Sequence, residues 1–316
     1  MIFIFIIYLF ILFWLFESLS SSDDKILEKN EESSISIIID QINDINDLLL
    51  TIDSIKSQDY DFNKINLILL DSSSNDIKSI VNVYSNIFSS IDVIKTSKIN
   101  KSETLNSFYA LYLDYILFIR SGTCIPKSFI STLSKYLQNS DFSIIFLPLF
   151  HKYEDRHQIF YQIYNSFIES IKCSLINKNF YLPDKNLVIK NDSFIAFVNK
   201  NLDKNINQTY LMTPELCLYK NLNLNFINMI NSDIINFIYL GINLLFILIL
   251  VQFLAIPSIY LLILIIIKII PEACFIYIFY NRIRVKFPKL DFLIFSVVGP
   301  FYYIIQFIES KVFIKQ

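Results

Sequence analysis

Glycine is scarce in this sequence. Only Gly122, Gly241 and Gly299 occur among 316 residues. Loops that wrap closely around phosphate groups usually depend on glycine, because glycine reaches positive φ angles and allows close backbone approach at little cost. The chain therefore has too few glycines to form a glycine-rich phosphate-binding loop.

Metal-binding patterns are also missing. The four cysteines, Cys124, Cys173, Cys217 and Cys274, are widely separated and form no CxxC pair, and the two histidines lie far from any cysteine. Such spacing is not that of a zinc site. The net charge of −2 provides no basic surplus, which argues against an extended nucleic-acid interface.

Hydrophobic residues are abundant and unevenly distributed. They make up 54% of the chain, and the mean hydropathy of +0.48 is high for a soluble globule. The uncharged run 2–16 is close to the shortest length for a spanning helix. No basic region precedes it, and residues 18–20 (SLS) only loosely resemble a signal-peptidase site. We favour an uncleaved membrane anchor at 1–17 over a cleaved signal.

A second apolar region begins near residue 234. The stretch 234–281 is too long for one span, and Pro257 and Gln252 near its middle predict a turn between two helices. The segment 282–289 is basic, and 292–308 is either a third short span or an interfacial helix. Basic loops face the cytoplasm. Because two helices separate this loop from the preceding polar region, we expect the polar region to be cytoplasmic as well.

The polar region has the pattern of an α/β domain. Short β-branched runs at 35–39, 65–70, 91–94 and 115–119 alternate with helical periodicity at 44–58, 76–87 and 102–113. This order predicts a mainly parallel sheet flanked by helices. Ligands bind at the carboxyl ends of such strands, so the loops of interest begin at Asp40, Asp71 and Arg120. The predicted organisation is an anchor (1–17), a polar linker (18–34), the α/β domain (35–232) and C-terminal transmembrane helices (233–316).

Four segments of this domain carry a resemblance to a known family: 36–44 (SIIIDQIND), 49–60, 66–76 (NLILLDSSSND) and 114–126 (DYILFIRSGTCIP). In order and spacing they are similar to an opening strand SIIIPVYNE, a helix ending SLxxQxY, a DDGSTD loop and a DYILFxDADxxxP segment. These are motifs of the family 2 glycosyltransferases, so the resemblance implies a GT-A fold. The C-terminal hydrophobic region is similar to that of membrane-anchored members from Bacteroidetes-type bacteria.

The resemblance implies transfer of a hexose from a nucleotide-sugar donor to a lipid-linked or polysaccharide acceptor, at the cytoplasmic face of a bacterial inner membrane. It also implies that Glu215, in the segment TPELCLYK, is the general base that deprotonates the acceptor hydroxyl. The residues that it assigns to donor binding are Asp40, Asn43, Asp44, Asp71, Ser72, Arg120 and Gly122.

The chain departs from the family pattern at its metal site. Arg120-Ser121-Gly122 stands where the family has Asp-x-Asp, and Ser72 replaces the second acid of the DDGS loop. Divalent cations need anionic oxygen ligands, whereas arginine only donates hydrogen bonds. We therefore predict no divalent cation. Either the Arg120 guanidinium contacts the donor diphosphate directly, or the replacement marks a decayed enzyme.

Further alternatives stay open at this point. Asn43 and Asp44 are explained equally well by capping of the following helix. Pro214 occupies the position next to Glu215 where the family has a second acid, and no QxxRW motif follows. A catalytically inactive pseudo-glycosyltransferase that serves as a scaffold or partner is thus the second hypothesis, and a decaying gene is the third.

Overall fold

The computed structural model describes residues 2–20, 33–42, 44–71, 77–95, 114–139, 142–152, 158–177, 186–191, 193, 208–221 and 234–313. Contacts divide the chain into two compact units. The helical unit comprises Met1–Ser20, His151–Ile171 and Leu222–Gln316. The α/β unit comprises Ser21–Phe150 and Lys172–Asn221. The segment 151–171, which the sequence places inside the 35–232 domain, thus groups with the helices.

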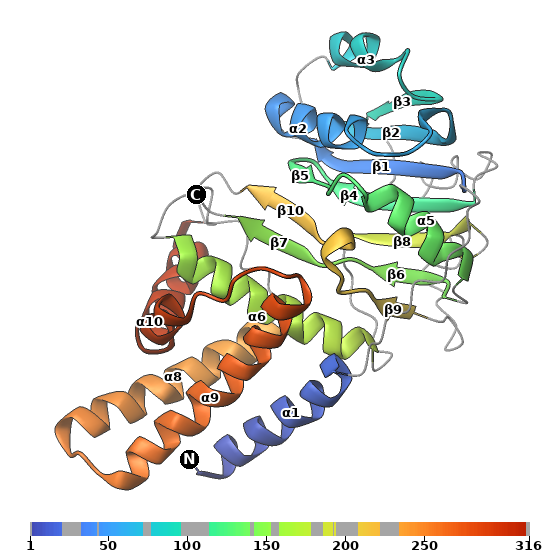
Figure 1. Ribbon diagram of the computed structural model, residues 1–316. Helices are drawn as coiled ribbons and strands as arrows, with labels where there is room; N and C mark the ends of the chain where they lie inside the picture. The colour runs from blue at the N-terminus through green and yellow to red at the C-terminus, as the bar shows by residue number, and fades with distance from the viewer. Residues whose placement is uncertain are drawn as a thin grey trace. The chain divides into compact units, whose positions relative to one another are not determined.

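The α/β unit is built on a seven-stranded sheet of order β3-β2-β1-β4-β8-β6-β9 (Figure 1). Its strands are β1 (Ile35–Ile42), β2 (Ile65–Asp71), β3 (Ser90–Lys95), β4 (Tyr115–Arg120), β6 (Ile144–Phe146), β8 (Leu187–Lys190) and β9 (Gln208–Tyr210). The strands β3, β2, β1 and β4 run parallel, and β8 pairs antiparallel with both β4 and β6. The predicted mainly parallel sheet is confirmed.

The central strand β1 explains why this sheet forms. Ile35, Ile37, Ile38 and Ile39 are all fully buried, so apolar side chains cover both faces of the strand. Strands with helices on both faces carry such continuous β-branched runs instead of an alternating pattern. The four predicted strands therefore appear within one residue of their expected bounds, except that β1 continues three residues further, to Ile42.

Helices follow the first two strands as expected. The helix α2 (Ile45–Lys56) buries Leu48, Thr51, Ile52 and Ile55, and α3 (Lys78–Tyr84) follows β2. A 3-10 turn, η1 (Phe62–Lys64), precedes β2. The helix predicted at 102–113 lies outside the described residues. A further helix, α5 (Phe129–Asn139), follows β4 and buries Phe129, Ile130 and Leu133 in the same core as α2.

A second, three-stranded sheet of order β5-β10-β7 was not predicted. It consists of β5 (Thr123–Cys124), β7 (Leu149–Lys152) and β10 (Leu218–Asn221). The strand β10 follows the 3-10 turn η4 (Pro214–Leu216) and runs antiparallel to β5. This pairing brings a segment near residue 220 beside the turn that ends β4.

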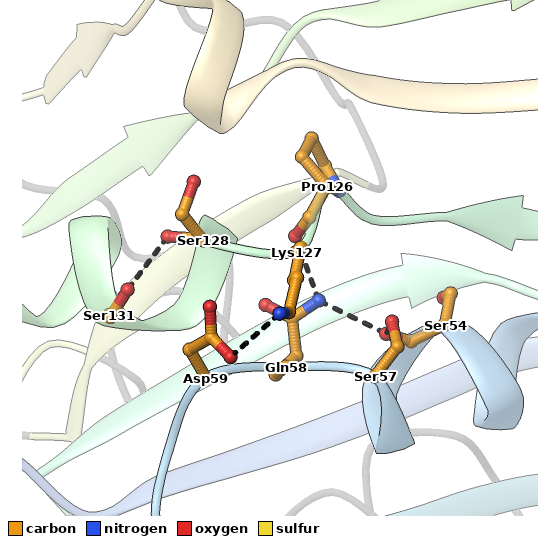
Figure 2. Close-up of polar contacts among 8 residues, drawn as sticks. All are labelled: Ser54, Ser57, Gln58, Asp59, Pro126, Lys127, Ser128 and Ser131. Atoms are coloured by element: carbon orange, nitrogen blue, oxygen red, sulfur yellow. Dashed lines mark hydrogen bonds and ion pairs between the residues drawn. The ribbon is translucent and has the colours of Figure 1, made fainter.

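One buried amide joins α2 to the segment before α5 (Figure 2). The Gln58 side chain donates from Nε2 to the carbonyl oxygens of Ser54, at 3.0 Å, and Pro126, at 2.8 Å. Its Oε1 accepts from the backbone N–H of Ile130 at 3.1 Å. On the exposed side of this junction, Lys127 forms an ion pair with Asp59 at 3.4 Å. Gln58 therefore fixes the position of α5 relative to α2.

We expect Gln58→Ala to lower the free energy of unfolding by about 2–4 kcal/mol, because the substitution removes all three of these hydrogen bonds and leaves the Ile130 N–H without its side-chain acceptor. Ser57→Ala is the matched control. Its exposed hydroxyl donates only within its own turn, to the Ser54 carbonyl at 2.8 Å. Urea titration of the detergent-solubilised chain, followed by circular dichroism, measures both variants. Equal effects of the two substitutions would contradict this role of Gln58.

The helical unit contains the long apolar helices. Its elements are α1 (Ile2–Ser20), the first part of α6 (Ile159–Asn177), α8 (Ile234–Ala255), α9 (Ile259–Arg282) and α10 (Lys289–Phe313). The predicted division of 234–281 into two helices is confirmed. The turn, however, lies at 256–258 rather than at Gln252, which is inside α8. Pro257 lacks an N–H for the helical ladder, and Ser258 caps α9 by accepting from the Leu261 N–H.

The prediction of spanning helices at both termini is met only in part. Among the described residues, α9 is the one helix long and apolar enough to cross a bilayer. The apolar stretches Tyr8–Glu17 in α1 and Gly241–Ala255 in α8 are shorter than that criterion requires. The structure therefore provides one candidate span, and the multi-pass arrangement stays a prediction.

Two opposite charges are buried inside α9. The Lys268 Nζ lies 2.8 Å from Glu272 Oε2, one turn away, and the two side chains are only 1% and 4% exposed. The other oxygen of Glu272 accepts a hydrogen bond from the Tyr8 hydroxyl of α1. Lys268 Nζ also lies 4.6 Å from the ring centroid of Phe246 in α8. Charges within apolar helices are tolerated when they face the bundle interior and are paired, so this pair specifies how α1, α8 and α9 pack.

We expect Glu272→Ala to destabilise the helical unit by about 3–5 kcal/mol, because the Lys268 ammonium is left buried without its counter-charge. The double variant Lys268→Met/Glu272→Leu removes both charges and fills a similar volume, so it should retain most of the stability. Thermal unfolding in detergent, followed by the helical circular dichroism signal, compares the two. A double variant as unstable as Glu272→Ala would show that lost packing, and not the unpaired charge, is responsible.

Candidate functional site

Three polar residues lie at or near the carboxyl ends of adjacent parallel strands of the α/β unit. Asp40 of β1 lies opposite Arg120 of β4 in the strand register, and Asp71 of β2 lies opposite Ile42 of β1. Parallel strands present their carboxyl ends at one edge of a sheet. The predicted convergence of Asp40, Asp71 and Arg120 at that edge is therefore observed. Their roles in donor binding stay predictions.

The loop after β1 supplies a helix cap. The Asp44 carboxylate accepts a hydrogen bond from the Asn46 N–H at 3.0 Å and is the N-cap of α2. Capping satisfies one of the backbone N–H groups that have no partner within a helix, which gives Asp44 a structural role. Asn43 and Ser72 lie outside the described residues.

The turn Arg120-Ser121-Gly122 after β4 is attached to α2. Gly122 has φ of 80°, a left-handed conformation that residues with a Cβ adopt at a cost. Its N–H donates to the Asp47 carbonyl at 3.0 Å and to the Thr51 hydroxyl at 2.9 Å. Thr51 in turn donates to the Asp47 carbonyl at 3.1 Å. The preceding residue, Ser121, donates its N–H to the Asp40 carbonyl at 2.9 Å. Backbone hydrogen bonds thus fix this turn on both sides.

A carboxylate lies against the glycine. A Cβ atom at Gly122 would be 3.0 Å from both Cγ and Oδ2 of Asp47. Asp47 is in the first turn of α2, where a negative charge interacts favourably with the helix dipole. No pattern in the sequence singles out Asp47.

Lys220 is the functional candidate that sequence reasoning missed. In β10 it lies opposite Thr123 of β5, and its Nζ donates to the Ser121 carbonyl at 2.9 Å. Burial lowers the pKa of Lys220; the negative charge of Asp47 acts in the opposite direction, and the positive charge of Arg120 lowers the pKa further. Lys220 is ninety-nine residues from Ser121 along the chain, so no local sequence signal connects the two.

Arg120 retains unused hydrogen-bonding capacity. Its Nε is buried and has no hydrogen-bond partner among the residues that the structure describes. The same holds, within the described chain, for the hydroxyl oxygens of Ser121 and Thr123. Buried donors normally have partners, so a polar group is expected to complete this turn.

The side chains of this turn do not fit a divalent cation. Two cationic groups, Arg120 and Lys220, occupy the neighbourhood where the family pattern has carboxylates. No cluster of three or more His, Cys, Asp or Glu residues suited to a metal is found in the described part of the chain. The prediction that the chain uses no divalent cation rests on this chemistry.

Glu215 lies on the same segment of the chain as Lys220. It belongs to η4, five residues before Lys220, and is half-buried. Its charge contributes to the environment of Tyr219, where burial, followed by the influence of Cys217 and Glu215, raises the pKa to about 12. The Tyr219 ring also packs edge-on against Phe150, with centroids 6.1 Å apart. The assignment of Glu215 as the general base stays a prediction.

No protein-family profile matches the chain, and no curated protein sequence matches it. Among solved structures, it is similar to the mannosyltransferase PcManGT from Pyrobaculum calidifontis in complex with GDP-Man and Mn²⁺. The identity is 11%, the TM-score is 0.48, and the match covers 96% of this chain and 94% of that one. It is also similar to S. aureus TarS 1-349, at 11% identity and a TM-score of 0.40, covering 60% of each chain. The TarS 1-349 complex with UDP is 13% identical, with a TM-score of 0.38, and the match covers 60% of this chain and 61% of that one. Likeness at this level carries no conclusion about the ligand or activity of this chain.

The attachment of the turn to α2 leads to a stability prediction. We expect Gly122→Ala to destabilise the α/β unit by about 1–3 kcal/mol, because the new Cβ must adopt a positive φ and would lie within 3.0 Å of Asp47. Gly241→Ala is the matched control, since a Cβ there meets nothing within 4 Å and alanine favours a helix. Urea titration followed by labelling of the buried Cys217 thiol reports opening of this unit. A Gly122→Ala variant as stable as the control would contradict the argument.

Proposed function

We propose that this chain is a membrane-bound glycosyltransferase that moves a hexose from a nucleotide-sugar donor to a lipid-linked or polysaccharide acceptor. The observation that supports the proposal most directly is the common edge of β2, β1 and β4, where Asp71, Asp40 and Arg120 end adjacent strands. Ligands of open α/β sheets bind at such an edge. Four segments also resemble family 2 glycosyltransferases in the same order along the chain, and this resemblance indicates the type of reaction.

In this proposal, different residues of the chain bind the nucleotide, stabilise the leaving group and deprotonate the acceptor. Asp71 accepts hydrogen bonds from the base or ribose of the nucleotide. Arg120 faces the diphosphate, whose negative charge grows as the nucleotide leaves, and positive charge placed there lowers the barrier. Glu215 removes the proton from the acceptor hydroxyl as the hydroxyl oxygen attacks the sugar. No divalent cation takes part, because arginine stands at the metal-binding position.

The membrane arrangement is part of the proposal. The apolar helices α8 and α9 follow one another through the short turn 256–258, and the basic segment 282–289 comes directly after them. With both helices spanning, the basic loop and the α/β unit are on the cytoplasmic side, as the positive-inside rule predicts. In this proposal, nucleotide sugars and lipid-linked acceptors are both available on the cytoplasmic side.

Transfer and binding are tested separately. Membrane vesicles that contain the chain are incubated with labelled UDP- and GDP-sugars in EDTA, and label is counted in the lipid and polymer fractions. We expect Asp71→Asn to weaken nucleotide binding about tenfold, and Glu215→Gln to abolish transfer while leaving binding intact. Asp92→Asn, an exposed carboxylate on β3, is the control and should change neither.

The second hypothesis, an inactive scaffold, predicts a different experimental result. The missing QxxRW motif and the lost Asp-x-Asp carboxylates favour it. Nucleotide binding without any transfer, unaffected by Glu215→Gln, would identify a pseudo-glycosyltransferase. Failure of the folded chain to bind any nucleotide or nucleotide sugar, with or without Mn²⁺, would overturn the proposed function.

A further inference from the structure

Two cations that are far apart in the sequence lie near one another at the end of β4. Arg120 is the last residue of that strand, and β10 places Lys220 opposite Thr123, directly after the same turn. The Lys220 ammonium is held there by the Ser121 carbonyl at 2.9 Å. Because β10 pairs with β5 through its backbone, this position is a property of the fold and not of a mobile surface side chain.

Two like charges in a partly buried place repel each other. Burial and the Arg120 charge both disfavour the charged form of Lys220, and Asp47 opposes them. The Arg120 Nε is buried without a hydrogen-bond partner in the described chain. A guanidinium has five N–H donors and an ammonium has three. An anion with several oxygens would relieve the repulsion and accept these hydrogen bonds.

We propose that Arg120 and Lys220 together bind the diphosphate of a nucleotide and replace the divalent cation at this site. The inference deepens the proposed function and rests on it for the identity of the ligand. A diphosphate matches the pair because its oxygens can accept from two separate cations, and arginine can contact two of them at once. Neither residue needs a bound metal to do this.

Asp47 partly offsets the positive charge of this pair. Its carboxylate lies against Gly122, and its negative charge favours the protonated Lys220. The same negative charge opposes the approach of a diphosphate. Asp40, opposite Arg120 on β1, is a further carboxylate at this edge, and its negative charge also opposes the binding of phosphate oxygens by the pair.

The experiment measures binding of inorganic pyrophosphate, UDP and GDP to the full chain in detergent by calorimetry, once in EDTA and once with Mn²⁺. We expect binding in EDTA that Mn²⁺ does not strengthen. Lys220→Gln and Arg120→Gln should each weaken it about tenfold or more, and Asp47→Asn should strengthen it. Lys127→Gln removes the same charge from an exposed lysine, 74% accessible and paired with Asp59, and should have no effect.

The outcomes separate this inference from the proposed function. Nucleotide binding that requires Mn²⁺ and ignores Lys220→Gln overturns the cation pair and leaves the glycosyltransferase proposal standing. Pyrophosphate binding that depends on both cations, with no preference for UDP or GDP, supports the pair and argues against a nucleotide donor. If no diphosphate binds to the folded chain, both proposals fail. Circular dichroism of each variant shows whether it is folded.

Discussion

The backbone of the turn after β4 is the constraint on which the candidate site depends. Gly122 shares its N–H between the Asp47 carbonyl and the Thr51 hydroxyl, and only a residue without a Cβ takes the required conformation cheaply. Thr51 belongs to the buried face of α2, so the turn is attached to the hydrophobic core. Few glycines are available in this chain, and this one occupies a position where the geometry requires it.

Buried charged side chains have different partners in the two units. In the helical unit, Lys268 and Glu272 neutralise each other within one helix, and Tyr8 satisfies the remaining carboxylate oxygen. In the α/β unit, the cations Arg120 and Lys220 lie near one another, and Lys220 is held by a backbone carbonyl. A buried ion pair that is complete within the chain fits a role in packing. A buried Arg120 Nε with no hydrogen-bond partner among the described residues fits a role in binding.

Sequence periodicity predicted the α/β core because local forces dominate there. The run around Ile37 and Ile39 is β-branched and uncharged, so it forms a strand wherever it is buried, and the repeat of Leu48, Ile52 and Ile55 forms a helix on it. The turn at Gln252 was misplaced, because an amide is tolerated inside a helix while Pro257 is not. The expectation of spans at both termini exceeded what the described helices support.

The sequence by itself determined the alternation of strands and helices, the edge that carries Asp40, Asp71 and Arg120, and the residues of the turn after β4, Arg120-Ser121-Gly122. Each follows from residue type or from spacing over a few positions. Only the tertiary structure decided that Lys220 and Asp47 flank the turn beside Arg120, and that Glu272 receives a hydrogen bond from Tyr8. These contacts join residues dozens to hundreds of positions apart. Their pairing is set by strand register and helix packing, which no short stretch of sequence encodes.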